Sequence, residues 1–314
     1  MSTDPKPINR RAGHRPEWLK IRVPGDLQRL PIARLMNDLA LNTVCQEARC
    51  PNIFECWSAG TATFMILGDI CTRRCTFCAV GKGKPLAADT DEPRRVAAAV
   101  AAMNARHVVI TMVNRDDLSD GGAREVASTV HAVRDRTGAT IEVLISDLEG
   151  NRDALRTVLA ARPEVLAHNV ETIPRLYAQV RPVAKYARSL DVLRWAHEER
   201  FDGMLTKSSI MLGLGENEEE VLGVAAELRN SGVDVFTMGQ YLAPTGNHHP
   251  VRRYYTPAEF DELGRRAREL GFHHIESGPL VRSSYMAHRA IESSAQHAAR
   301  SLSRCGEGGR VRRG

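Results

Sequence analysis

The sequence predicts an α/β protein built around a partial (β/α)6 barrel of the TIM type, with an N-terminal extension and a C-terminal segment. Two observations favour the barrel. Short apolar runs alternate with helical stretches of about ten or more residues, and cysteine or polar residues follow the ends of several runs. Six such units span roughly 215 residues, too few for a complete eight-stranded barrel. We therefore expect chemistry at the carboxyl ends of the strands.

The elements are predicted in order along the chain. Residues 1–60 are rich in proline and form an extension of loops and short helices. Residues 61–276 form the barrel, with strands expected at 64–67, 107–111, 140–145, 165–169, 204–212 and 233–238. Helices are expected at 92–104, 121–137, 151–160, 187–200 and 217–230, followed by a weaker pair, a helix at 257–270 and a strand at 272–276. Residues 277–314 hold a loop, a short alanine-rich helix and a basic tail.

Composition limits the function classes. Hydrophobic residues make up 43% and charged residues 26% of the 314 residues, which is typical of a globular chain. No run of eighteen apolar residues predicts a membrane helix, and the polar N-terminus lacks the apolar region of a secretory signal, so we expect a cytoplasmic protein. The net charge of +5 is explained either by solvated tails or by a basic face for an acidic partner. The aromatic content of 5% disfavours nucleic-acid binding.

The cysteines are the most informative residues. Six of the seven lie between Cys45 and Cys78, and an odd total without a secretory signal favours metal binding over disulfides. Cys71, Cys75 and Cys78 have the spacing CxxxCxxC directly after the first predicted strand. Three thiolates can bind three irons of a [4Fe–4S] cluster and leave the fourth iron open for a reacting ligand. The alternative is a structural zinc site, which would need a fourth protein ligand from elsewhere.

Another set of three cysteines lies earlier in the chain, before the first predicted strand. Cys45, Cys50 and Cys56 have the spacing CxxxxCxxxxxC on a segment that Pro51 breaks, so a single helix is not expected. This set predicts either a second iron–sulfur cluster or a structural zinc site. Cys305 is the remaining cysteine that could complete it, but it lies in a tail of glycine and arginine without apolar neighbours.

These motifs resemble those of a known family. CxxxCxxC with Phe77 before its last cysteine resembles the signature of the radical S-adenosylmethionine (SAM) superfamily. The segments LNTVCQEARCPNIFECW and GTATFMILGDICTRRCTFCAV together resemble the lipoyl synthase family. The resemblance continues through HNVETIPRLYAQVRP, TKSSIMLGLGENEEEV, FTMGQYLAPT and SGPLVRSSY, and covers roughly residues 15–290. The order of the two cysteine sets speaks against the methylthiotransferase and biotin synthase relatives.

The resemblance implies a reaction and its cofactors. Two [4Fe–4S] clusters and S-adenosylmethionine are expected, one cluster on Cys71, Cys75 and Cys78 for radical generation. The other, an auxiliary cluster, is expected on Cys45, Cys50 and Cys56, with Ser284 of the C-terminal segment as its fourth ligand. Serine is a hard and weak ligand for cluster iron, which suits a cluster that is consumed as a sulfur donor. The implied enzyme is a sulfurtransferase that inserts sulfur at C6 and C8 of a protein-bound octanoyl-lysine.

The resemblance also implies partners. These are octanoylated lipoyl carrier domains, such as the acyltransferase subunit of a 2-oxoacid dehydrogenase and the glycine-cleavage H protein, together with an electron donor and an iron–sulfur cluster carrier. No nucleic acid and no membrane are expected. A protein that merely binds zinc or stores iron is the rival from a different functional class, and the metal content distinguishes it.

Polar residues follow two further predicted strands. Asn169 and Glu171 end the fourth strand, and we expect one of them to contact S-adenosylmethionine. Arg115, Asp116 and Asp117 follow the second strand, where the aspartates are expected either to cap the next helix or to contact cofactor or substrate.

Two weaker patterns remain. Gly213 and Gly215 follow the fifth strand and form either a nucleotide-binding loop or a tight turn. His248 and His249 lie in a proline-flanked segment, for which a surface loop is favoured over a metal site.

Overall fold

The structure is a computed structural model that describes residues 15–21, 30–58 and 60–292, and its centre is one large sheet. In these residues the sheet has eight strands, in the spatial order β1 (Asn42–Thr43), β2 (Thr63–Ile66), β5 (His107–Met112), β6 (Thr140–Leu144), β7 (Val165–Ala167), β8 (Leu205–Leu212), β9 (Val235–Gln240) and β10 (His274–Gly278). All neighbours from β2 to β10 are parallel, and β1 is antiparallel to β2. The two edge strands each have one neighbour, so this is the open barrel predicted from the sequence, with its six strands confirmed and the weaker seventh added.

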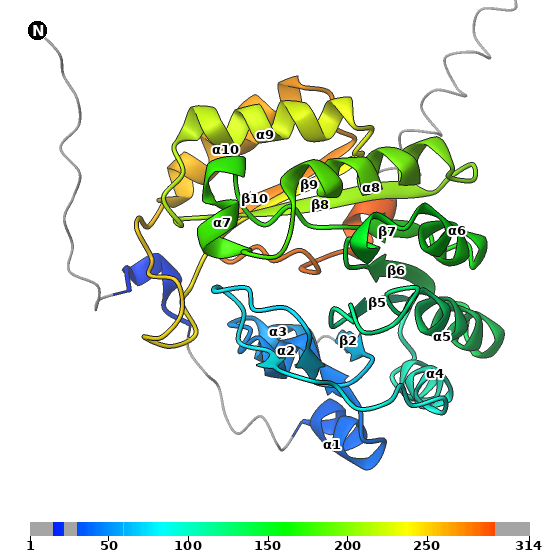
Figure 1. The fold of residues 1–314 in the computed structure, drawn as a ribbon. Coiled ribbons are helices and arrows are strands. Elements are labelled where there is room, and N and C mark those ends of the chain that lie inside the picture. The colour runs from blue at the N-terminus through cyan, green and yellow to red at the C-terminus, as the bar shows by residue number, and fades with distance from the viewer. Residues whose placement is uncertain (1–14, 22–29, 59, 293–314) are drawn as a thin grey trace, which may run out of the picture.

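Helices connect the parallel strands and lie along the outside of the sheet (Figure 1). They are α4 (Glu92–Ala102), α5 (Ala123–Arg136), α6 (Arg152–Ala160), α8 (Tyr186–Glu198), α9 (Glu218–Asn230) and α10 (Pro257–Glu269). Local sequence fixes several of their starts. Asn217 forms a capping box with Glu220 at α9, and Thr256 forms one with Glu259 at α10. The predicted helices are therefore confirmed to within a few residues at each end.

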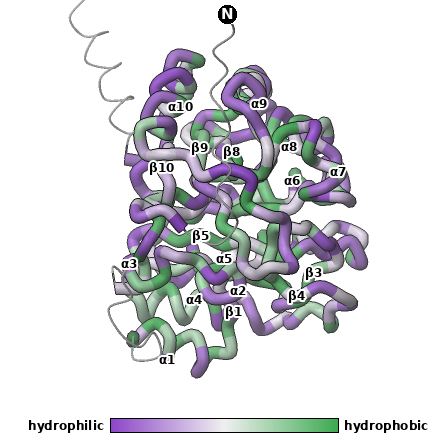
Figure 2. The backbone as a smooth tube through the Cα atoms, turned by 90° about the vertical axis from the view of Figure 1, so that its left-hand side faces the viewer, coloured by the Kyte–Doolittle hydropathy of each residue, from purple (hydrophilic) through white to green (hydrophobic). Residues whose placement is uncertain are grey.

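The strands are buried on both faces, as expected for a parallel sheet covered by helices. Every residue of β2 and β9 is buried. Figure 2 shows hydrophobic residues along β5 inside the molecule and hydrophilic residues along much of α10 outside. A charged pair lies within this apolar interior: Lys207 Nζ on β8 is 2.9 Å from both carboxylate oxygens of Glu142 on β6. A fully buried pair of this kind contributes little net stability but would be costly to break.

The N-terminal extension consists of short helices and connecting segments, as predicted. They are η1 (Glu17–Leu19), α1 (Pro31–Asp38), α2 (Val44–Glu47) and α3 (Ile53–Ser58). The extension contacts a segment that is distant in the sequence. The Trp18 indole donates a hydrogen bond of 3.2 Å to the carbonyl of Tyr255, just before α10. Figure 1 shows η1 beside the segment that leads into α10.

Several short elements were not predicted. Between β2 and α4, the strands β3 (Ile70–Cys71) and β4 (Gly81–Lys82) pair in parallel. The helical turns η3 (Leu148–Gly150), η4 (Pro174–Leu176) and α7 (Tyr177–Val180) follow β6 and β7. Their lengths of three or four residues are too short to produce a periodic pattern.

Residues 288–292 are helical, and the rest of the expected alanine-rich helix, Cys305 and the basic tail lie outside the described residues. None of the described helices is both long enough and apolar enough to cross a bilayer. The division of the chain at residues 60 and 276 stays a prediction.

Candidate active site

A cavity of about 470 Å³ opens at the carboxyl ends of the barrel strands. Its walls come from three parts of the chain: the N-terminal extension, the barrel, and a C-terminal loop at residues 277–285. Five of the clustered cysteines line it, namely Cys45, Cys50, Cys71, Cys75 and Cys78. A volume of this size is in the range of small-molecule sites, so the cavity can hold a cofactor together with part of a substrate.

The second cysteine loop, residues 70–82, leaves β3 and returns at β4. The backbone N–H of Arg73 donates to Cys71 Sγ at 3.4 Å, and that of Cys78 donates to the Cys75 carbonyl at 3.3 Å. All three cysteines are free thiols. Burial raises the pKa of Cys75, and burial, with the nearby Cys75, Cys71 and Glu171, raises the pKa of Cys78 to about 12. Iron binding at this loop must therefore displace thiol protons.

The first cysteine loop, residues 44–56, places Cys45 on α2, Cys50 in the turn and Cys56 on α3. The Cys50 N–H donates to the Cys45 carbonyl at 3.0 Å, which folds the segment back on itself as the proline suggested. Burial raises the pKa of Cys45 and Cys50. Burial, together with the neighbouring Cys45 and Cys50 thiols, raises the pKa of Cys56 to about 12. The three thiols thus stay protonated, so iron binding here must also displace thiol protons.

The C-terminal loop is fastened to the first cysteine loop by two hydrogen bonds. Asn52 Nδ2 donates to the carbonyl of Leu280 at 2.7 Å, across 228 residues of sequence. The Tyr285 hydroxyl donates to Glu55 Oε1 at 3.0 Å, across 230 residues. These contacts place Ser284 in the wall of the same cavity as Cys45 and Cys50.

The donor sets fit the implied clusters. Each loop offers three free thiols, which is what a [4Fe–4S] cluster with one iron left to another ligand requires. Among the described residues, no group of three His, Cys, Asp or Glu side chains is placed to hold a single metal ion. A cubane cluster does not require such convergence, because each thiolate binds a different iron.

Polar side chains from β7 and the following turn lie on the barrel side of the cavity. Asn169 Nδ2 donates to Glu171 Oε1 at 3.0 Å, and Arg181 Nη1 donates to the Asn169 carbonyl at 2.9 Å. Burial raises the pKa of Glu171, although Arg181 and Asn169 oppose the shift. Asn169 Oδ1 and Arg181 Nε are buried without a hydrogen-bond partner among the described residues. Both residues line the cavity, and both atoms have hydrogen-bonding capacity that the described residues do not use.

The two aspartates after β5 pair with arginines and do not cap the next helix. Arg115 pairs with both oxygens of Asp117 at 2.8 Å, and Asp116 pairs with Arg73 of the second cysteine loop. The expected aspartate cap is wrong, because α5 begins after Gly122 without a side-chain cap. Contact of Arg115, Asp116 or Asp117 with cofactor or substrate stays a prediction.

The glycine segment after β8 forms a tight turn closed on Glu216, and its contact with a nucleotide stays a prediction. The backbone N–H groups of Leu214 and Gly215 both donate to Glu216 Oε2 at 3.0 Å, and Gly213 N–H donates to Glu216 Oε1. Since the chain's own carboxylate occupies these donors, a phosphate would have to displace it.

The histidine segment packs on the second cysteine loop, so the surface-loop expectation is wrong for His249, which is buried. Its backbone N–H donates to the Thr76 carbonyl at 2.9 Å. His248 Nε2 lies 3.2 Å from the Cys78 carbonyl.

Two buried arginines of the site, Arg73 and Arg181, were not predicted from the sequence. Arg73 lies between the cysteines of CxxxCxxC, and its place beside Arg74 made the pair look like ordinary surface charge. A usable signal existed, since acidic residues follow both β5 and β6 and need cationic partners if buried. Arg181 had no such signal, because it lies after a short helix that the pattern did not predict.

Comparisons with known proteins agree with this geometry. The model of the Radical SAM superfamily matches residues 65–228. The chain is 56% identical over 281 residues to a lipoyl synthase of Rubrobacter xylanophilus, covering 89% of this chain and 87% of the relative. It is 51% identical over 298 residues to a lipoyl synthase of a Roseiflexus species, covering 95% and 98%.

Solved structures share the fold at low identity. SuiB of Streptococcus suis, bound to the precursor peptide SuiA, superposes with a TM-score of 0.54 at 12% identity, over 72% of this chain and 52% of that chain. This chain thus spans about half the length of SuiB. Methylornithine synthase (PylB) superposes with a TM-score of 0.50 at 14% identity, over 82% and 85%. The structural similarity shows the barrel, while the sequence identity over nearly the whole chain shows the narrower group: the chain belongs to the lipoyl synthase family of the radical SAM superfamily.

Proposed function

We propose that Cys71, Cys75 and Cys78 hold the radical-generating cluster, and that Cys45, Cys50 and Cys56, with Ser284, hold the auxiliary cluster that donates sulfur. As a lipoyl synthase, the chain is a radical SAM sulfurtransferase that uses two [4Fe–4S] clusters and S-adenosylmethionine. The observation that supports the assignment is a single cavity bordered by five of the six thiols and by Ser284. When bound, these groups supply the reducing electron, the hydrogen-abstracting group and the sulfur.

The polar residues beside the second cysteine loop would hold S-adenosylmethionine. Glu171, with its carboxylate buried beside Asn169, suits an ammonium group, and the unpartnered Nε of Arg181 suits a carboxylate. Together they would orient the amino-acid end of the cofactor toward the iron that lacks a protein ligand. The expectation that Asn169 or Glu171 contacts the cofactor is thus retained in the proposal.

The remaining walls suit an alkyl chain. Apolar side chains from several strand ends line the cavity, among them Met65, Met112, Ile145, Met211 and Leu242. Such walls bind the octanoyl chain and keep water from a reactive carbon. C6 and C8 would have to lie between the two cysteine loops, within reach of both.

Ser284 acts as the releasable ligand. Its hydroxyl is a hard oxygen donor and binds iron less firmly than a thiolate. Two hydrogen bonds join the C-terminal loop to the first cysteine loop, and Ser284 lines the same cavity as Cys45 and Cys50, which supports this assignment. A site of this kind retains the cluster until sulfur is removed.

The substrate is a protein-bound octanoyl group, carried by a lipoyl domain of a 2-oxoacid dehydrogenase acyltransferase subunit or by the glycine-cleavage H protein. The net charge of +5 favours acidic carrier domains by electrostatic steering. An electron donor and an iron–sulfur cluster carrier complete the cycle.

The test uses the full chain, reconstituted anaerobically with sulfide of a heavy sulfur isotope, then mixed with an octanoyl-lysine peptide, S-adenosylmethionine and dithionite. Mass spectrometry should find two labelled sulfurs in the product. Replacing Cys71, Cys75 and Cys78 by Ala should abolish S-adenosylmethionine cleavage. Replacing Cys45, Cys50 and Cys56 by Ala should retain cleavage without thiolation. Labelled product from the second variant would overturn the donor assignment.

A further inference from the structure

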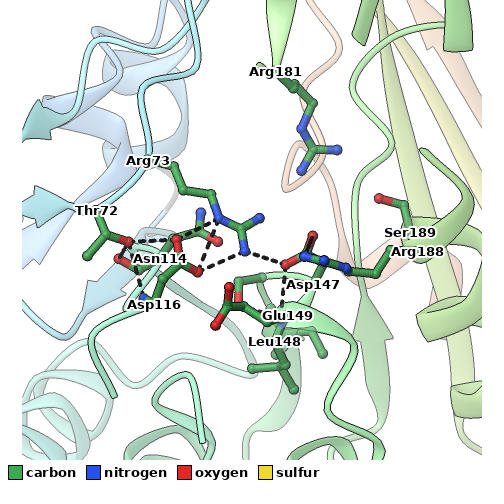
Figure 3. A network of polar contacts seen from close by, with 12 residues as sticks. Thr72, Arg73, Asn114, Asp116, Asp147, Leu148, Glu149, Arg181, Arg188 and Ser189 are labelled. Carbon is green, nitrogen blue, oxygen red and sulfur yellow. Dashed lines mark hydrogen bonds and ion pairs between the residues drawn. The ribbon is translucent and has the colours of Figure 1, made fainter. Parts of the chain in front are cut away.

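Arg73 occupies an unusual position in the second cysteine loop. Its side chain is 2% exposed, and its guanidinium lies between Asp116, which follows β5, and Asp147, which follows β6 (Figure 3). There Nη2 lies 2.8 Å from Asp116 Oδ1 and 2.6 Å from Asp147 Oδ1, and Nε lies 2.9 Å from Asp116 Oδ2. The guanidinium therefore binds two carboxylates from two different strand ends at once.

The same network fastens the loop at its neighbouring residue. The Thr72 hydroxyl is 3.0 Å from the Asn114 carbonyl and 3.0 Å from Asp116 Oδ2, and the Thr72 N–H donates to the Asn114 carbonyl at 3.1 Å. Figure 3 shows Thr72, Asn114 and Asp116 grouped on one side of the guanidinium and Asp147 on the other. Residues 72 and 73 are thus joined to the segments that directly follow the buried strands β5 and β6.

Fold stability alone is a poor explanation for this network. Asp147 is fully buried; burial raises its pKa, but hydrogen bonding to Arg73 reverses this and lowers the pKa to about 2. A buried ion pair repays little of its desolvation cost, and apolar residues often stabilise a fold equally well. Its benefit is a fixed geometry at the place where it is attached.

That place is the ligand loop itself. The backbone N–H of Arg73 donates to Cys71 Sγ at 3.4 Å, so the position of residue 73 determines a hydrogen bond to a ligand sulfur. Hydrogen bonds to cluster sulfurs and ligand orientation tune the potential and the retention of a cluster. Arg74 provides a comparison, since it is exposed and no side-chain hydrogen bond or ion pair of it is found in the part of the chain that the structure describes.

We propose that Arg73 is a positioning residue for the radical-generating cluster: its buried guanidinium, fixed by Asp116 and Asp147, holds the loop so that the Arg73 N–H stays against Cys71 Sγ. The inference rests on the proposed function, in which Cys71, Cys75 and Cys78 hold that cluster. According to this inference, the guanidinium affects how firmly the radical-generating cluster is bound and what its electronic properties are. It has no effect on the auxiliary cluster.

The experiment compares Arg73→Met with the matched variant Arg74→Met, both as full-length protein reconstituted anaerobically to about eight irons per chain. Iron release to a chelator and the electron paramagnetic resonance spectrum of the dithionite-reduced protein, with and without S-adenosylmethionine, are measured. In Arg73→Met we expect half of the iron to leave about 10- to 100-fold faster, as is typical when an outer partner of a metal ligand is lost. The spectrum in the presence of S-adenosylmethionine should change, and Arg74→Met should match the wild type in both measurements.

A second variant separates positioning from folding. Arg73→Met with Asp147→Asn leaves no charge at the two fully buried positions. Asp116, whose side chain is 24% exposed, and Arg188, which pairs with Asp147 at 3.4 Å and is 21% exposed, can be solvated. If Arg73 positions the cluster, this double variant folds yet keeps the fast iron release and the altered spectrum. A wild-type spectrum and wild-type iron release in either Arg73 variant would overturn the inference.

The proposed function is checked separately in the same preparation. Replacement of Cys71, Cys75 and Cys78 by Ala should remove the half of the iron that Arg73→Met loosens. If that triple variant keeps its S-adenosylmethionine-sensitive signal, the cluster assignment fails. If the signal disappears there but Arg73→Met behaves as wild type, only the inference about Arg73 fails.

Discussion

The two cysteine loops border the same cavity but are attached to the rest of the chain in different ways. The second loop is fixed by a buried charge network that joins Arg73 to the ends of β5 and β6. The first loop is joined to the C-terminal loop by two hydrogen bonds that involve no ion pair, from Asn52 to Leu280 and from Tyr285 to Glu55. Buried ion pairs therefore hold the second cysteine loop, whereas hydrogen bonds between distant segments, without an ion pair, hold the first cysteine loop against the C-terminal loop.

This difference suits the two proposed tasks. A cluster that passes electrons repeatedly gains from ligands that do not move, since rigid elements hold a functional site more accurately than loops do. A cluster that is dismantled for its sulfur must be entered and rebuilt, and segments held by few hydrogen bonds open more readily. The comparison leads to four predictions, given from the largest expected effect to the smallest.

Asp147→Ala should have the largest effect, because it removes a fully buried partner of Arg73. We expect the free energy of unfolding to fall by about 3 to 5 kcal/mol. Urea denaturation of the cluster-free chain, followed by circular dichroism, measures it. Asp153→Ala is the control, since Asp153 is 88% exposed in its pair with Arg156 and should change little. Equal losses of the free energy of unfolding in the two variants would show that the network around Arg73 does not hold the second cysteine loop in place.

The second largest effect should be a loss of stability in acid, caused by histidines that are buried in the barrel. Burial, assisted by Arg181, lowers the pKa of His168 to about 4, so between about pH 6.5 and pH 4 the unfolded chain binds the additional proton. The free energy of unfolding should therefore fall as pH falls through this range, by on the order of 3 kcal/mol for His168. Burial also lowers the pKa of His107, to about 3, which adds a loss of the same sign.

Below about pH 4, protonation of Asp147 should continue the loss, because the pKa of Asp147 is about 2 in the fold. Denaturation of the cluster-free chain at a series of pH values tests the slope. His168→Gln should flatten it between pH 6.5 and 4. The exposed His131→Gln serves as control, and a slope that His168→Gln leaves unchanged would contradict the assignment.

Ser284→Cys should lower turnover without lowering the iron content. A thiolate binds cluster iron more firmly than a hydroxyl, so sulfur should leave the auxiliary cluster more slowly, with product formation reduced about 10- to 100-fold. Ser283→Cys is the matched control, since Ser283 also lines the cavity. Should both variants turn over equally, Ser284 has no special role at the first cysteine loop.

Tyr285→Phe should have the smallest effect. The hydrogen bond from its hydroxyl to Glu55 lies near the surface, and its removal should cost about 0.5 kcal/mol in the same denaturation experiment. A loss as large as that of Asp147→Ala would mean that the first cysteine loop is as firmly held as the second.

The sequence predicted the barrel and the cysteine sets well, because both depend on local patterns. The strands at 107–111 and 233–238 are short segments rich in Val, Ile and Phe, and the CxxxCxxC spacing is a property of eight adjacent residues. The partners of Arg73 were not predictable in the same way, since Asp116 and Asp147 lie 43 and 74 residues away and only the sheet brings them together. The position of Ser284 came from the family resemblance alone.

The bonds between residues 52 and 280 and between residues 55 and 285 also determine when each site can exist during synthesis. A nascent chain that has reached residue 240 already contains Cys71, Arg73, Asp116, Asp147 and every strand from β2 to β9. It contains no part of the C-terminal loop that closes the other site. The contacts that complete the proposed auxiliary site can therefore form only after residues 280–285 have been synthesised, later than those around Arg73.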